Sequence, residues 1–83
     1  QQGGGQEILK KLYAVAEAKL SSAKELAALA ESVMRRFGTE DWARTLYKKA
    51  AEAEDFDKLK FAVAESVQKS LGDHKLAGSL RAA

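Results

Sequence analysis

The 83-residue sequence contains no cysteine and no proline, and its one histidine is His74. Without cysteine there is no disulfide framework and no thiol nucleophile, and a single histidine is too few ligands for a structural zinc site. The apolar stretches are short because Lys and Glu interrupt them, so no segment is a candidate membrane span. These absences predict a soluble protein that has no metal site and no cofactor.

Positive and negative charges nearly balance, since 14 Lys and Arg against 12 Asp and Glu give a formal net charge of +2. A balance this close is unfavourable for nucleic-acid binding, which needs a strongly basic surface. One basic group surrounds Trp42, but Glu40 and Asp41 interrupt it. Its members are Arg35, Arg36, Arg44, Lys48 and Lys49. We therefore expect neither nucleic acid nor a membrane as the partner.

Residue usage favours helix, because sixteen Ala and ten Leu stand against four Val, one Ile and two Thr. The sequence therefore predicts an all-α fold in one domain over residues 7–83.

Residues 1–6 read QQGGGQ, and because three successive glycines are costly to order we expect a disordered tail or a scar left by cloning. The first residue is Gln and the last helix lacks a stop signal, which indicates a piece of a longer protein. The missing cysteine and signal peptide favour the cytoplasm.

An internal repeat organises the chain. Residues 13–46 align with residues 47–80 without a gap, and eleven of the 34 aligned pairs are identical. The identities include a contiguous block, Ala-Glu-Ser-Val, at residues 30–33 and again at 64–67. A fixed period of this length is typical of stacked helical units that cannot bury their apolar faces alone. A lone helix precedes the two repeats.

Helix start and stop signals recur with this period. Gly38 and Gly72 are typical of the left-handed residue that ends a helix, and a capping residue type follows each of them directly. The other boundary contains Ser22 and Glu25 at the spacing of a capping box. The predicted helices span residues 7–20, 22–37, 39–54, 56–71 and 73–82.

Apolar residues recur at helical spacing in each of these segments. The aromatic residues Trp42, Tyr47 and Phe61 fall on the apolar stripes of their helices, so we expect these side chains in the core. Alanines on the same stripes let neighbouring helices approach closely, which favours antiparallel pairs joined by tight turns.

The helix after each turn glycine resembles the tetratricopeptide repeat, whose unit is a helix-turn-helix of 34 residues. The family's pattern in this helix is a turn glycine, a small residue, an aromatic residue and an alanine. In this chain the matching residues are, in the same order, Gly38, Ala43, Tyr47 and Ala50. The later copy has Arg81 at the aromatic position, and the other helix lacks the family's Leu-Gly pair and closing proline. The resemblance implies antiparallel helix pairs stacked as a short right-handed α-solenoid of about five helices, with a concave groove that holds a peptide or a partner helix.

Carried onto this chain, the resemblance places the groove on the second and fourth helices. The implied groove residues are Glu25, Ala28, Ser32, Arg35 and Arg36, with Leu59, Ala62, Ser66 and Lys69. Small residues leave room for a ligand, Ser32 and Ser66 offer hydroxyl contacts, and the cations attract carboxylates. The family's Lys and Asn pattern for a C-terminal carboxylate is missing, so no such specificity is expected.

Plainer interpretations exist for several of these residues. Glu31 with Arg35, and Glu65 with Lys69, have the spacing of stabilising ion pairs on one helix. The acidic cluster of residues 52–57 lacks the glycine and the distal glutamate of a calcium loop, so helix termination is favoured. His74 has no Ser, Asp or Cys constellation around it, and nothing in the sequence indicates catalysis.

Two hypotheses of function follow. The first is a non-catalytic protein-interaction module that binds a peptide or a partner helix, with an acidic partner favoured. The alternative is a structural slice of a longer repeat array, or a self-assembling unit that stacks through its terminal helices, with Leu76 and Leu80 at the interface.

Overall fold

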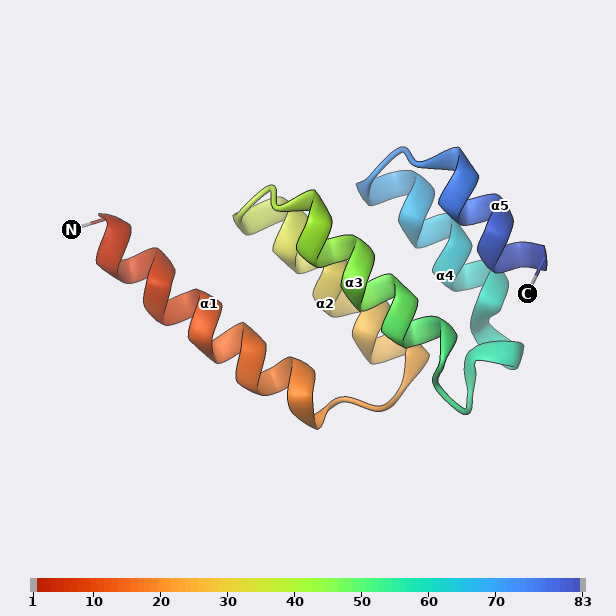
Figure 1. Cartoon of the computed structure of the whole chain (residues 1–83), viewed down its shortest axis with the longest axis horizontal. Helices are drawn as coiled ribbons and strands as arrows, with labels where there is room; N and C mark the ends of the chain where they lie inside the picture. The colour runs from red at the N-terminus through yellow and green to blue at the C-terminus, as the bar shows by residue number, and fades with distance from the viewer. Residues whose placement is uncertain (1, 83) are drawn as a thin grey trace.

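The computed structural model describes residues 2–82, and within this range the chain forms five helices and no strand (Figure 1). The helices are α1 (Gln2–Lys19), α2 (Ala23–Arg36), α3 (Glu40–Ala51), α4 (Phe56–Ser70) and α5 (His74–Ala82). The all-α prediction is therefore confirmed. In the described part of the chain, no helix has the length and apolar character needed to cross a membrane.

Two helix boundaries differ clearly from those predicted. Helix α1 begins at Gln2, so residues 2–6 continue this helix where the sequence predicts a tail. Extending a formed helix avoids the cost of nucleation, which is why glycines that would not start a helix can lengthen one. Helix α3 ends at Ala51, three residues before the predicted end at 54. Gln1 and Ala83, the outer ends of the predicted tail and domain, lie outside the described residues.

Successive helices run antiparallel and lie in two layers (Figure 1). Helices α2 and α4 form one layer, and α1, α3 and α5 form the other. The most extensive contacts are those of α2 with α3, of α4 with α5, and of α2 with α4. The molecule is elongated, with principal dimensions of 43, 25 and 14 Å, and α1 lies at one end of it.

Small residues build much of the core. Ala30 and Ala64, which occupy the same place in the two repeats, are both fully buried, and so are Val33 and Val67. Because an alanine side chain ends at Cβ, these helices approach closely without leaving voids. The four residues belong to the two Ala-Glu-Ser-Val blocks, which therefore have matching burial at these positions.

The predicted core position of the aromatic residues is confirmed for Tyr47, confirmed in part for Trp42 and wrong for Phe61. Tyr47 is fully buried and Trp42 is partly buried, but the Phe61 side chain is 65% exposed, so its assignment to the core is wrong. Ala27, the residue aligned with Phe61, is only 7% exposed because it lies on the side of α2 that faces α4. Within the described chain no further helix follows α4 in its layer, and Phe61 therefore stays uncovered.

The turn glycines have the predicted conformation. Gly38 and Gly72 both have φ of 65°, the left-handed region that favours glycine. Each also donates its backbone N–H to the last turn of the preceding helix, with Val33 and Met34 as acceptors in the first case. The Gly72 N–H donates in the same way to the carbonyls of Val67 and Gln68, at 3.2 and 3.1 Å, the same two distances as for Gly38. The helix ends are therefore set by local sequence.

The predicted capping box at the start of α2 is wrong. Ser22 makes no capping hydrogen bond, and its hydroxyl instead donates to Asp55 Oδ2 at 2.8 Å. The Ala23 N–H donates to the other oxygen of Asp55 at 2.8 Å, so a residue from the α3–α4 turn caps α2. Asp73 caps its own helix, since it accepts from Leu76 N–H at 3.0 Å. A cap supplied from 32 residues away cannot be read from local sequence.

These caps make the stability of the fold sensitive to acid. The Ala23 N–H and the Ser22 hydroxyl hold the pKa of Asp55 below its usual 3.8, and the Leu76 N–H and Arg44 do the same to the pKa of Asp73. A carboxyl whose pKa is lowered by folding stabilises the native state above its unfolded pKa. That contribution is lost as the pH falls from 3.8 through the lowered pKa.

We therefore expect the free energy of unfolding to fall on acidification below pH 3.8, and the double variant Asp55→Asn/Asp73→Asn to show a smaller fall. Urea unfolding followed by circular dichroism over a series of pH values measures both. The control is Glu54→Gln, which removes an exposed carboxyl of the same turn that caps neither helix. An unchanged acid dependence in the double variant would contradict the assignment.

Candidate functional site: a groove between α2 and α4

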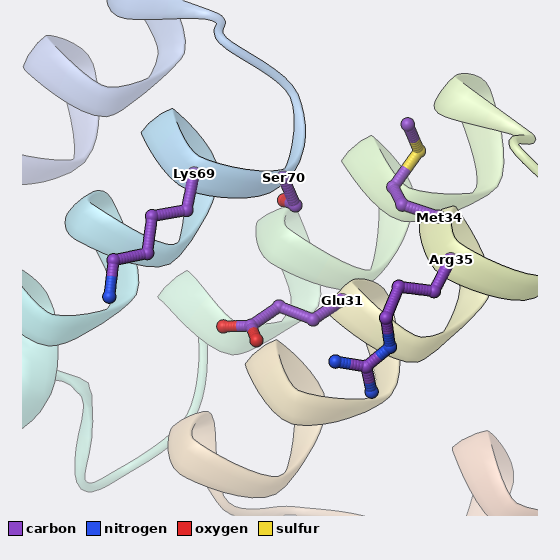
Figure 2. A pocket seen from close by; sticks show the side chains of 5 residues that line it. All are labelled: Glu31, Met34, Arg35, Lys69 and Ser70. Atoms are coloured by element: carbon purple, nitrogen blue, oxygen red, sulfur yellow. The ribbon is translucent and has the colours of Figure 1, made fainter.

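Two hollows lie along the seam between α2 and α4, and both are lined by Glu31. The first has a volume of about 330 Å³ and is lined by Lys24, Ala27, Ala28, Glu31, Leu59, Ala62, Val63 and Ser66. The second has a volume of about 340 Å³ and is lined by Glu31, Met34, Arg35, Lys69 and Ser70 (Figure 2). Because they meet at Glu31, we treat them as one feature, the α2–α4 groove.

The first hollow is apolar because alanines line it on both helices. Ala27 and Ala28 come from α2, and Ala62 comes from α4 next to Val63. Val63 is 1% exposed and Ala27 is 7% exposed, so these two residues form the floor, while Ala28 and Ala62 are open to solvent. Side chains this short leave space above the floor that an incoming apolar group can fill.

The second hollow carries charge. Figure 2 shows Glu31 reaching from α2 toward α4, with Arg35 beside it on α2 and Lys69 on α4. Glu31 already accepts a hydrogen bond from Ser66 Oγ, so its carboxylate is engaged within the chain. The side chains of Arg35 and Lys69 are exposed. The surface offered to a ligand at this end is therefore cationic, which favours carboxylates.

A buried hydrogen-bond network forms the wall behind the groove. The Tyr47 hydroxyl is 2.7 Å from both Ser66 Oγ and Ser70 Oγ, and Ser66 links the network to Glu31. Burial raises the pKa of Tyr47, so its hydroxyl stays protonated at neutral pH. These bonds join α3, α4 and α2 and fix the position of Glu31 between the two hollows.

The same tyrosine-serine contact occurs one period earlier. Tyr13 Oη lies 2.6 Å from Ser32 Oγ, and the Tyr47–Ser66 pair has the same separation of 19 residues along the chain. The hydroxyls of Ser32 and Ser66 thus bond to tyrosines of the neighbouring helix. The expected contact of these two hydroxyls with a ligand has no support in this arrangement.

Removing the Tyr47 hydroxyl should weaken the fold measurably. Tyr47→Phe is expected to lower the free energy of unfolding by about 1–1.5 kcal/mol, because the buried hydroxyl that donates its one proton between Ser66 Oγ and Ser70 Oγ is removed. Ser66 and Ser70 each keep another partner, Glu31 and the Ser66 carbonyl, which limits the cost. Tyr13→Phe removes one partly buried bond, so its effect should be about 0.5 kcal/mol. Urea unfolding measures the free energy of unfolding of the two variants. Equal losses of free energy in Tyr47→Phe and Tyr13→Phe would contradict this prediction.

The structure brings together six of the nine groove residues that the resemblance implies. These are Ala28, Arg35, Leu59, Ala62, Ser66 and Lys69. Glu25, Ser32 and Arg36 do not line either hollow, and Ser32 bonds to α1 instead. All four implied positions on α4 line the groove. On α2, the line of implied residues is rotated around the helix axis by about a quarter of a turn from the line of residues that actually line the groove.

Sequence reasoning missed several lining residues. They are Lys24, Ala27, Glu31 and Met34 on α2, with Val63 and Ser70 on α4. Glu31 was expected to pair with Arg35, but it bonds to Ser66 of α4. The available signal was the helical spacing of Lys24, Glu31 and Arg35, which places them on one face of α2.

Two of the five basic residues around Trp42, Arg44 and Lys49, make ion pairs within the chain. Lys49 pairs with Glu17 at 2.6 Å, and Arg44 lies 3.2 Å from both Glu40 and Asp73. Trp42 Nε1 also donates to Glu17 at 3.1 Å. Burial alone would raise the pKa of Glu17, but the hydrogen bonds from Lys49 and Trp42 outweigh it and lower that pKa. The contacts of Lys49 and Trp42 with Glu17 fasten α1 to α3.

Comparison with models of known protein families, with curated protein sequences and with solved structures finds no match to this chain. The likeness to the tetratricopeptide repeat stays a prediction. In the described part of the chain, no group of three or more His, Cys, Asp or Glu side chains is placed to hold a metal ion. The groove combines an apolar hollow with two exposed cations, Arg35 and Lys69.

Proposed function

We propose that this chain is a non-catalytic protein-interaction module that holds an acidic peptide or partner helix in the α2–α4 groove. The observation that carries the proposal is the position of the apolar hollow directly beside the cationic one, with Glu31 common to both. A single ligand segment can therefore place an apolar side chain and a carboxylate on the same seam.

The apolar hollow supplies the anchor of the proposed interaction. Binding of a helix in an apolar groove depends on a few apolar side chains that enter pockets in the partner. The floor of Ala27 and Val63 belongs to the buried core and is held by helix packing, so the hollow exists before a ligand arrives. Little conformational entropy is then lost by the module on binding.

The cations supply the preference for acidic partners. Arg35 and Lys69 approach the second hollow from different helices, and Lys24 lines the first. The one acidic side chain that lines both hollows is Glu31, and its carboxylate accepts the Ser66 hydroxyl. An acidic ligand therefore meets favourable charge along the groove, and a basic ligand meets repulsion.

The test uses two synthetic helical peptides that share a leucine anchor and differ only in carrying aspartates or lysines beside it. Titration of the isotope-labelled chain should shift the amide signals of the α2–α4 groove with the acidic peptide and leave them unchanged with the basic one. Arg35→Glu/Lys69→Glu should weaken binding of the acidic peptide by about tenfold or more, which corresponds to about 1.4 kcal/mol.

The matched control is Lys48→Glu/Lys75→Glu, which makes the same change of net charge at exposed positions outside the groove. It should leave the affinity within about twofold of the parent. Circular dichroism verifies that all variants keep their helices. Equal affinity for the two peptides, or amide shifts confined to the α3 and α5 surface, would overturn the proposed function.

A further inference from the structure

Helix α1 exposes an apolar face at one end of the molecule. Ile8, Leu12 and Val15 are 62%, 59% and 54% exposed, and their spacing of four and three residues puts them on one side of the helix. Leu46, which is aligned with Leu12, is fully buried where α3 packs on α2 and α4. In helix α3 this side is covered by α2. In the described chain, no helix covers the corresponding side of α1.

A second exposed apolar surface lies on helix α4, at the other end of the molecule, and its apolar residue is Phe61. Phe61 is 65% exposed, and exposed carboxylates stand four residues before and after it, at Asp57 and Glu65. Lys60 Nζ lies 5.7 Å from the centre of the Phe61 ring, so a cation already approaches this ring. Since the aligned Ala27 faces α4, Phe61 faces the place where a further helix would pack.

Four residues on either side of Val15 and of Phe61, the two faces carry opposite charges. On α1, the exposed Lys11 and Lys19 stand four residues before and after Val15. On α4, Asp57 and Glu65 stand at the same spacing around Phe61. Each line of three side chains spans about 12 Å along its helix, with an apolar residue at the centre. An antiparallel or parallel pair of these helices brings cations onto anions around an apolar contact.

We infer that a second copy of this chain docks head to tail, with the α1 face of one copy on the α4 face of the next. The α1 face comprises Ile8, Lys11, Leu12, Val15 and Lys19, and the α4 face comprises Asp57, Phe61 and Glu65. Figure 1 shows the two helices at opposite ends of the molecule. Contacts between unlike faces do not close on themselves after two copies, so assembly continues beyond a dimer, into a ring or an open chain of copies.

This interface differs from the one expected on α5. Leu80 is only 4% exposed and belongs to the core, so it is not available to a neighbour. Leu76 is partly buried against the same core. The residues of the two docking faces are different from those that line the α2–α4 groove, so self-assembly and peptide binding are tested with different variants.

The inference is tested by sedimentation velocity and multi-angle light scattering of the chain over a range of concentrations. The average mass should rise with concentration beyond that of a dimer, and added salt should reduce it because the contact includes ion pairs. Lys11→Glu/Lys19→Glu alone, or Asp57→Lys/Glu65→Lys alone, should raise the concentration needed for assembly at least tenfold.

Mixing provides the decisive measurement. In an equimolar mixture of the two charge-reversed variants, each acidic face again meets a basic one, so assembly should return to within about threefold of the parent. Lys48→Glu/Lys75→Glu changes the net charge equally outside both faces and should assemble as the parent does. Val15→Ala/Phe61→Ala removes the apolar contact and should also abolish assembly.

Three outcomes would overturn the inference. The first is a monomer at every concentration, which would leave these faces to a different occupant or to solvent. The second is a closed dimer, and the third is assembly that persists in both charge-reversed variants. Circular dichroism of each variant establishes that its helices are formed before its mass is interpreted.

Discussion

Replacement of Leu46 by alanine should lower the free energy of unfolding by about 2–5 kcal/mol, which is a large part of the stability of a small domain. Leu46 is fully buried on α3 among the residues that join the two repeats. Truncation removes apolar contacts and leaves a cavity, because α2 and α4 are held apart by the remaining side chains. Urea unfolding followed by circular dichroism measures the loss.

The chain carries its own control for this prediction. Leu12 is aligned with Leu46 and has the same side chain, but it is 59% exposed. Leu12→Ala should therefore change the free energy of unfolding by about 0.5 kcal/mol or less. The unfolding experiment should be run at a concentration below any self-assembly. Similar losses for the two variants would mean that α1 is covered in the folded monomer, contrary to the structure.

Enlargement of Ala64 to leucine should destabilise the fold by about 1–3 kcal/mol, despite the added apolar surface. Ala64 is fully buried on α4, a helix that packs against α2, α3 and α5. A close-packed interior has no room for three more carbon atoms, so neighbouring helices must move or side chains must leave their preferred rotamers. The same unfolding measurement applies, and an unchanged or higher stability would contradict close packing at this position.

Ala62→Leu is the matched control on the same helix. Ala62 is exposed and lines the apolar hollow, so a larger side chain has space there and the stability should stay within about 0.5 kcal/mol of the parent. The variant also reports on function, because the leucine fills part of the groove. Binding of the acidic peptide should weaken in Ala62→Leu while the fold persists.

The helices were predictable because their signals are local. The positive φ of Gly38 and Gly72 follows from the steric freedom of glycine, and the hydrogen bonds of these turns involve residues within five positions. Helical spacing and alanine content depend on the same short range. Interactions within one or two turns decide such features, and the sequence displays them directly.

The groove was predictable in part. The implied positions on α4 line it, since residues 59, 62, 66 and 69 fall on the side of α4 that faces α2. On α2, the residues that the resemblance implies lie nearer to α1 than those that line the groove. Sequence spacing defines which residues share a face of a helix, but not which neighbouring helix that face contacts. Glu31 was missed for the same reason, since its partner Ser66 is 35 residues away.

The sequence by itself determined the helical character of the chain, its turn glycines and the 34-residue spacing of its apolar stripes, because each depends on backbone sterics and neighbouring residues. Only the tertiary structure decided that Phe61 is exposed, that Asp55 caps α2 and that Glu31 bridges to Ser66. Those outcomes depend on which helices lie beside one another and where the stack of helices ends, and residues far apart in the chain settle both.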